Sequence, residues 1–107
     1  MRLGRIRESD VDRWAESFGG DRGEVYNAFA RYIATAFDQK TLPFEFCDAV
    51  MNDLEAVVSN ADDERPDLFW SVYLAFDAGE YHRRADKSDD PVAEHTVPAI
   101  AAIVSGR

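Results

Sequence analysis

The sequence has little of what disulfide-bonded, membrane and zinc proteins require. Cys47 is the only cysteine, so no disulfide can form within the chain, which fits a reducing compartment. One cysteine and two histidines cannot build a zinc site from Cys and His alone. The first residues lack the apolar core of a signal peptide, and no stretch approaches the roughly 20 apolar residues of a membrane span. We therefore expect a cytoplasmic protein without a membrane partner.

Motifs for catalysis and for cofactors are also missing. The six glycines never form a GxGxxG or P-loop pattern, and neither HExxH nor CxxC occurs. Acid–base catalysis needs carboxylates in a cleft, whereas most carboxylates here lie at expected helix ends and loops, where solvent is expected. We therefore predict that the chain is not an enzyme and has no catalytic residue, no cofactor and no metal.

What the sequence does have is negative charge, unevenly distributed. The net charge is −9, yet residues 1–31 hold six arginines and six acidic residues, which cancel. Residues 32–107 hold six basic and fifteen acidic residues, so the whole excess lies there. Such a field repels the phosphates of nucleic acids and attracts basic proteins. The alternative is that net charge only keeps a small protein soluble.

The hydrophobic pattern predicts helices. With 107 residues and 46% hydrophobic residues, the chain can form one domain, residues 1–107, with a core of its own. Apolar residues recur at steps of three and four, which is typical of helices with one buried face. The predicted helices span residues 10–18, 21–38, the segment from Thr41-Leu42-Pro43 to 61, the segment after Pro66 that contains 68–76, and 97–104. We expect Ser9 and Asp21 to cap the first two.

The predicted fold is all-α, an antiparallel bundle of four main helices with a short extra N-terminal helix. Residues 68–76 are apolar on almost every side, which places that helix at the centre of the bundle or, alternatively, makes it a buried strand. We favour the helix because no other segment alternates like a partner strand. Pro98 implies either a helix that starts near Thr96 or a kink; we favour a turn over residues 91–95.

Several single residues have a structural explanation. Cys47 lies on an apolar stripe and is expected to be a buried hydrophobe, since its neighbours are acidic. Trp70 and Trp14 are expected in the core, although tryptophan can also anchor an interface. Asp77 follows the apolar run; it is either a buried acid bonded to Tyr or Arg, or the point where the helix leaves the core.

The stretch from about residue 32 to 104 resembles small acidic all-helical immunity proteins of the colicin and pyocin type. The resemblance lies in the order of the segments YIATAF, LPFEFCDAVMNDLEAV, an acidic break, LFWSVYLAFDAGEY, an acidic loop and a last short helix. It implies a protein that binds and blocks a cognate toxin, often a nuclease with a basic active site. The segment DDPVAEHTVPAIAAIV departs from the expected pattern because it contains Pro98 and little charge.

This resemblance gives the acidity a mechanism, in which complementary charge steers the encounter and aromatic anchors supply binding energy. Asp77 and Glu80 support it, because acids at the C-terminal end of a helix are unfavourable to the helix dipole and invite a basic partner. Arg83 and Arg84 partly neutralise these acids. The predicted partner-binding residues are Asp63, Glu64, Asp67, Asp77, Glu80, Tyr81, Asp86, Asp89 and Asp90.

Two alternatives remain open at this stage. One is a structural or interaction subunit, for example a homodimer through an exposed apolar face that includes Trp14 and Phe18. The other is a metal protein or enzyme, for which the candidate ligands would be Asp77, Glu80, His82, Glu94 and His95.

Overall fold

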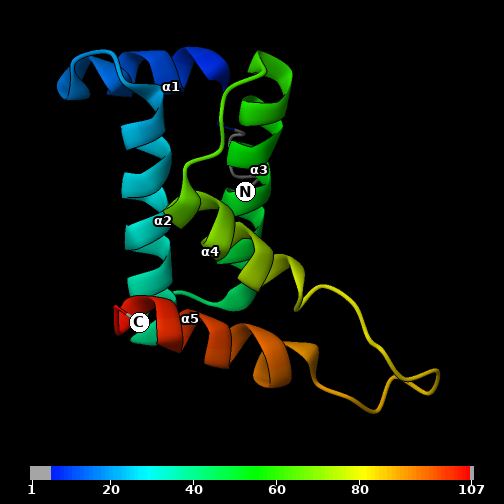
Figure 1. Cartoon of the computed structure of the whole chain (residues 1–107). Coiled ribbons are helices and arrows are strands. Elements are labelled where there is room, and N and C mark those ends of the chain that lie inside the picture. The colour runs from blue at the N-terminus through cyan, green and yellow to red at the C-terminus, as the bar shows by residue number, and fades with distance from the viewer. Residues whose placement is uncertain (1–5, 107) are drawn as a thin grey trace.

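Five α-helices make up the structure, a computed structural model that describes residues 6–106 (Figure 1). They are α1 (Glu8–Ala15), α2 (Arg22–Asp38), α3 (Phe44–Ala61), α4 (Asp67–Asp77) and α5 (Val97–Val104). A short 3₁₀ helix, Glu16–Phe18, follows α1, and a π-helical turn, Val92–Thr96, precedes α5. Within residues 6–106 there is no β-strand, so the prediction of an all-α domain is confirmed.

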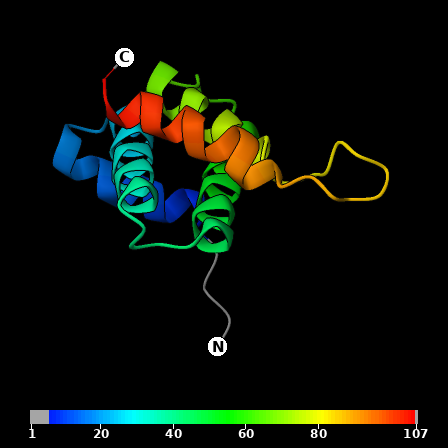
Figure 2. The same ribbon diagram turned by 90° about the horizontal axis from the view of Figure 1, so that it is seen from below.

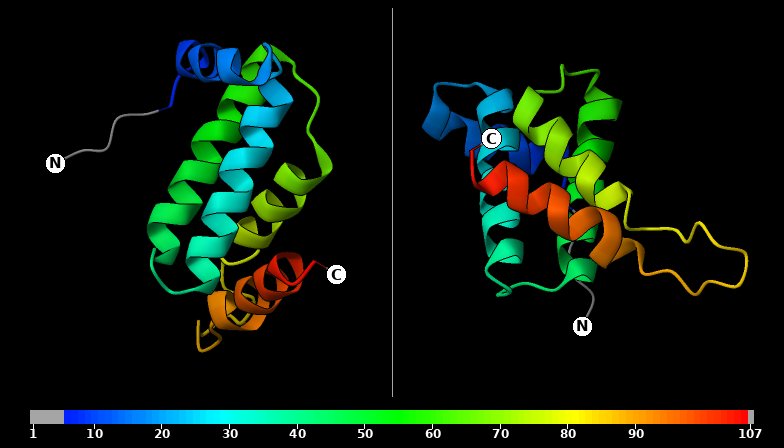
Figure 3. Two further views of the ribbon diagram at one scale, coloured as in Figure 1. Left: turned by 90° about the vertical axis from the view of Figure 1, so that its left-hand side faces the viewer. Right: turned by 60° about the horizontal axis from the view of Figure 1, so that its bottom comes forward.

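The long helices α2 and α3 run antiparallel and side by side (Figures 1 and 3). The shorter helices α4 and α5 cross one face of this pair obliquely, as the view along α2 and α3 in Figure 2 shows. Helix α1 lies across one end of the pair. Helix α2 contacts all four other helices and is the centre of the packing, a place that the sequence pattern assigned to α4.

The core lies between α2, α3 and α4, with contributions from α1 and α5. Its largest fully buried side chains are Tyr26, Phe69, Phe76, Met51 and Leu54. Cys47 is fully buried, as expected, and burial raises the pKa of its thiol to about 11.

The two tryptophans, both expected in the core, differ in how far they belong to it. Trp14 is only half-buried and packs against Phe29 at the margin of the core, with ring centroids 5.2 Å apart. Trp70 is half-buried on the outward side of α4, and Leu74 on the same helix is 44% exposed. The prediction that Trp70 belongs to the core is therefore wrong. An almost continuous apolar run does not require burial on every side.

One of the two predicted helix caps is confirmed. The Asp21 carboxylate accepts a hydrogen bond from the Glu24 backbone N–H at 3.3 Å, as an N-cap residue does. Ser9 is wrong as a cap, because α1 begins one residue earlier and Arg7 is its N-cap. At this N-terminus the Asp10 carboxylate accepts a hydrogen bond from the Arg7 backbone N–H at 3.0 Å.

The segment before α5 is helical rather than a turn, which corrects the expectation for residues 91–95. In the π-helical turn the Val97 N–H donates to the Val92 carbonyl, five residues back. Pro98 follows directly, and proline has no N–H and clashes with the carbonyl four residues before it, so a wider turn accommodates it without breaking the helix. Thr96 does not cap α5; its buried hydroxyl donates to the Ala75 carbonyl in the last turn of α4 at 2.8 Å.

A network centred on Arg22 fixes α1 and the α3–α4 connection to α2. The guanidinium donates from Nε to Asp63 at 2.9 Å, and from Nη1 to Glu8 at 3.1 Å and Asp12 at 2.7 Å. The Tyr26 hydroxyl donates to Asp63 at 2.6 Å. Burial and this contact raise the pKa of Tyr26 to about 12. We call these five residues the Arg22 network.

No helix in the described range, residues 6–106, combines the length and the apolar character needed to cross a membrane.

Candidate functional site

Three carboxylates meet where α3 passes the end of α4. Asp48 lies on α3, Asp77 is the last residue of α4, and Glu80 follows in the turn after it. Asn52, one helical turn after Asp48, donates from Nδ2 to the Glu80 carboxylate at 2.9 Å and to the Asp48 carboxylate at 3.3 Å. We call Asp48, Asp77 and Glu80 the acidic cluster.

The acidic cluster holds negative charge that no cation of the described chain neutralises. Within residues 6–106, no Lys, Arg or His forms an ion pair with any of its three carboxylates. Burial, followed by the Glu80 and Asp77 carboxylates, raises the pKa of Asp48 to about 7, and the Asn52 amide only partly opposes this. Asp77 and Glu80 also lie at the negative end of the α4 dipole. A cation placed here would lower the electrostatic energy of the site.

A pair of stacked aromatic rings adjoins the acidic cluster along α4. The rings of Trp70 and Tyr73 are 5.2 Å apart and inclined by only 13°. The Arg65 guanidinium lies 5.1 Å over the Trp70 ring and is held in turn by Glu55, at 2.9 Å from Nε. Burial, followed by the charge of Asp77, raises the pKa of Tyr73, which places Tyr73 electrostatically next to the acidic cluster. We call Trp70 and Tyr73 the aromatic pair.

The acidic cluster and the aromatic pair together suit a cationic side chain. Carboxylates accept charge-assisted hydrogen bonds from ammonium and guanidinium groups. The rings add apolar contact area beside them, while the Trp70 face already carries Arg65. Asp77 and Glu80 were predicted as partner-binding residues, and the structure brings them together. Asp48, Asn52 and the aromatic pair were not predicted as site residues from the sequence, although Asp48 and Asn52 form a polar i, i+4 pair beside the apolar stripe of α3.

The other predicted residues do not join this cluster. Glu64 and Asp67 are exposed at the start of α4, about 15 Å from its end at 1.5 Å per residue. Asp63 belongs to the Arg22 network and is held by Arg22 and Tyr26. The nine predicted residues therefore do not form one patch.

The loop after α4 contains the remaining predicted residues, and one of them has an internal role. The side chain of Asp89 is only 4% exposed. It accepts hydrogen bonds from the backbone N–H groups of Arg83 at 2.8 Å and Arg84 at 3.4 Å, and it contacts His82 Nδ1 at 3.1 Å. The Arg83 N–H first, and His82 with it, lower the pKa of Asp89 to about 2. Asp89 is therefore corrected from a partner-binding residue to a residue that holds the loop.

The three other residues of this loop remain at the surface. Tyr81 is 54% exposed, and both Asp86 and Asp90 are exposed. Each of the two carboxylates accepts one local backbone hydrogen bond, Asp86 from Ser88 at 3.0 Å and Asp90 from Ala93 at 3.2 Å. These bonds fix turns and leave the acids accessible.

The structure gives little support to the two alternatives, a metal site and an apolar dimer face. No three His, Cys, Asp or Glu side chains within residues 6–106 are placed so that they could hold a metal ion. Of the proposed apolar dimer face, Phe18 is 42% exposed, but Trp14 packs against Phe29.

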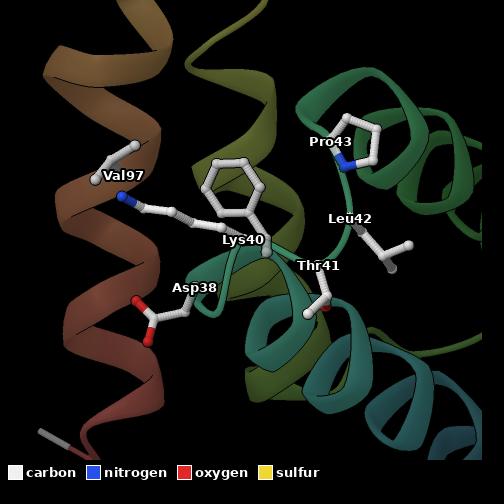
Figure 4. Close-up of a pocket in the computed structure, with 7 residues that line it drawn as sticks. Asp38, Lys40, Thr41, Leu42, Pro43 and Val97 are labelled. Atoms are coloured by element: carbon white, nitrogen blue, oxygen red, sulfur yellow. The ribbon is translucent and has the colours of Figure 1, made fainter.

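A pocket of about 360 Å³ lies between the α2–α3 connection and the start of α5 (Figure 4). It is lined by Phe37, Asp38, Lys40, Thr41, Leu42, Pro43 and Val97. Lys40 and Asp38 extend toward α5 in Figure 4. The Thr41 hydroxyl already donates to the Ala36 carbonyl at 3.0 Å. The lining contains neither a pair of carboxylates nor a nucleophile next to a base, so it does not have the composition of a hydrolytic active site.

Comparison of the chain with protein-family models, with curated proteins and with solved structures found no match. The resemblance to immunity proteins gains no support from these comparisons. The acidic cluster and the aromatic pair are therefore the features of this chain that bear on its function.

Proposed function

We propose that this chain is a non-enzymatic binding protein that takes a basic protein partner on the acidic cluster and the aromatic pair. The more specific form of the proposal, which the resemblance implies, is an inhibitor that blocks a basic toxin of the nuclease type. One observation carries the proposal. The Asn52 amide bridges the Asp48 and Glu80 carboxylates, Asp77 lies near enough to raise the pKa of Asp48, stacked aromatic rings are adjacent on α4, and no cation within residues 6–106 forms an ion pair with these three acids.

Electrostatics explains why a basic side chain fits this site. Burial first, and the negative charge of Glu80 and Asp77 with it, raise the pKa of Asp48 to about 7, so the ionised form of this carboxyl is disfavoured in the chain alone. An incoming Lys or Arg would supply the missing positive charge and favour the ionised carboxylate. The net charge of −9 would steer a basic protein toward this surface and would repel a nucleic acid.

The aromatic pair would supply contact area that charge alone does not. Tyr and Trp are the residue types that most often dominate interface energies, because they bury a large area at a small cost in side-chain entropy. Trp70 and Tyr73 are half-buried and pre-ordered by their mutual stacking and by Arg65. A partner would therefore find these rings already in place.

The experiment compares two variants that change the net charge equally. The immobilised chain captures basic proteins from an extract of its host at low salt, and the captured protein is identified, purified and titrated calorimetrically. We expect Asp77→Lys/Glu80→Lys to weaken its binding about tenfold or more, since a charge pair is inverted at the contact. Glu64→Lys/Asp67→Lys, at the other end of α4, is the matched control and should change the affinity by less than about threefold.

Equal losses in the two variants would mean that the chain attracts basic proteins by net charge alone, and the assignment to the acidic cluster would be wrong. Failure to capture any basic protein at low salt would refute the function itself. For the inhibitor form, the purified partner should cleave nucleic acid, and the wild-type chain should stop the cleavage.

A further inference from the structure

The loop of residues 81–88 differs in charge and in shape from the rest of the molecule. It extends away from the helices after α4 (Figures 1, 2 and 3). It contains Arg83, Arg84 and Lys87 but only one acid, Asp86. The remainder of the chain is therefore more negative than the net charge of −9 indicates. We call residues 81–88 the basic loop.

The basic loop is held through its backbone, which leaves its cationic side chains available. Asp89 binds the backbone N–H groups of Arg83 and Arg84, so neither guanidinium is used in the hold. The Arg83 guanidinium lies 4.4 Å over the Tyr81 ring and donates to the Tyr81 carbonyl at 3.1 Å. Within residues 6–106, neither Arg84 nor Lys87 forms an ion pair with an acid. Arg83 is thus engaged locally by Tyr81, whereas Arg84 and Lys87 carry positive charge that no acid within residues 6–106 pairs.

A surface of opposite sign adjoins the basic loop. Glu80 of the acidic cluster directly precedes Tyr81, so the basic loop begins at the edge of the acidic cluster and extends from there. They do not neutralise each other within one chain, because no ion pair joins the two. A patch with a positive and a negative half side by side is complementary to a second copy of itself after a twofold rotation.

We propose that the basic loop docks on the acidic cluster of a second copy of this chain, so that two copies exchange their loops reciprocally. This inference rests on the proposed function in one respect: the second copy occupies the same acidic cluster as the basic partner. Self-association would therefore cover the binding site, and a basic partner would bind only by displacing the second copy.

A second copy fits the basic loop better than a nucleic acid does. A nucleic acid is a long polyanion, and the net charge of −9 on the chain repels it as it approaches. That repulsion opposes the attraction of three cations. A second copy is also acidic, but unlike a nucleic acid it carries a basic loop of its own, so the reciprocal exchange pairs cations with carboxylates in two loop–cluster contacts in all.

Sedimentation velocity at low and at high salt tests this inference without any partner present. We expect a concentration-dependent dimer at low salt that dissociates at high salt. Arg84→Glu and Glu80→Lys should each raise the dissociation constant of the dimer about tenfold or more, and an equimolar mixture of the two variants should recover association through restored charge pairs. Arg31→Glu, an exposed residue on α2 with the same charge change as Arg84→Glu, is the matched control.

A monomer at every concentration in low salt would overturn the proposal, and so would an equal effect of Arg31→Glu or a mixture that stays monomeric. These outcomes are separate from those for the proposed function, because they involve no partner. Self-association that survives Arg84→Glu would show a dimer of another kind and would equally refute the role of the basic loop.

Discussion

Two places in this molecule gather three carboxylates around one side chain, and they differ in what that side chain is. In the Arg22 network the central group is a guanidinium, which binds Glu8, Asp12 and Asp63. In the acidic cluster the central group is the neutral amide of Asn52, which bridges Asp48 and Glu80 while Asp77 lies alongside. In the first arrangement a cation of the chain binds all three carboxylates and holds the fold together, although the group as a whole stays negative. The second leaves its charge for something outside the chain.

The contrast also explains why the number of acidic residues in a segment does not by itself indicate a binding site for a basic partner. Asp63 and Asp77 were both predicted to face a partner. Asp63 is bound by Arg22 and Tyr26, whereas Asp77 has no ion pair within residues 6–106. An acid therefore points to a partner only when the chain provides no cation of its own.

Removing the cation from the Arg22 network should have the largest effect on stability. Arg22→Met leaves three carboxylates without their partner, and we expect the free energy of unfolding to fall by about 2 kcal/mol, less than for a fully buried pair because two of the carboxylates are exposed. Urea denaturation at neutral pH measures the change. Asn52→Ala, which removes the central side chain of the acidic cluster, is the matched variant and should cost less than about 1 kcal/mol.

The comparison fails if Asn52→Ala destabilises the protein as much as Arg22→Met does. In that case the acidic cluster would be as structural as the Arg22 network.

Removing one charge from the acidic cluster should raise the stability of the protein, whereas Arg22→Met lowers it. The gain should be present only above acidic pH. The pKa of Asp48 rises on folding from 3.8 to about 7, so the folded state binds the proton more tightly than the unfolded state. Ionisation of Asp48 therefore lowers stability progressively as pH rises from about 4 to 7. We expect Asp48→Asn to match the wild type below pH 4 and to be more stable by about 1–2 kcal/mol above pH 7.

Thermal or urea unfolding of both proteins across this pH range measures the difference. A constant difference at every pH would contradict the assignment of the raised pKa to Asp48.

The smallest global effect is expected from Asp89→Asn, which alters only the base of the basic loop. The pKa of Asp89 is lowered to about 2, so its stabilising contribution is present above its ordinary pKa of 3.8 and is lost as pH falls toward 2. The variant should leave the unfolding transition nearly unchanged. Amide exchange of Arg83 and Arg84 should accelerate about tenfold or more, because their N–H groups lose a charged acceptor. Unchanged exchange at these two amides would contradict the role of Asp89.

Local features could be predicted from the sequence because their causes lie within a few residues. The helix pattern of residues 21–38 and the Asp21 cap depend on neighbours three or four positions away, and both agree with the structure. Cys47 could be placed in the core because it continues an apolar stripe on a single helix. The π-helical turn was missed because Pro98 allows several local solutions, and the contact of Thr96 with Ala75 selects among them.

The candidate site was predicted only in part because its contacts join distant segments. Asn52 and Glu80 are 28 residues apart, and Arg22 and Asp63 are 41 residues apart. No local pattern indicates which acid will meet a cation and which will meet an amide. The hydrophobicity of Trp70 predicts that it lies in the core. Its outward position follows from the oblique crossing of α4, which depends on how the helices pack and cannot be seen in the sequence of α4 alone.

The burial of Cys47 gives the protein a built-in reporter of its own opening. It is the only thiol in the chain, it is fully covered, and its pKa of about 11 keeps it protonated at neutral pH. An alkylating reagent can therefore react only in the fraction of molecules in which α3 has separated from the core. The rate of alkylation then measures that fraction directly, under conditions where spectroscopy sees only the folded state, and without any added label.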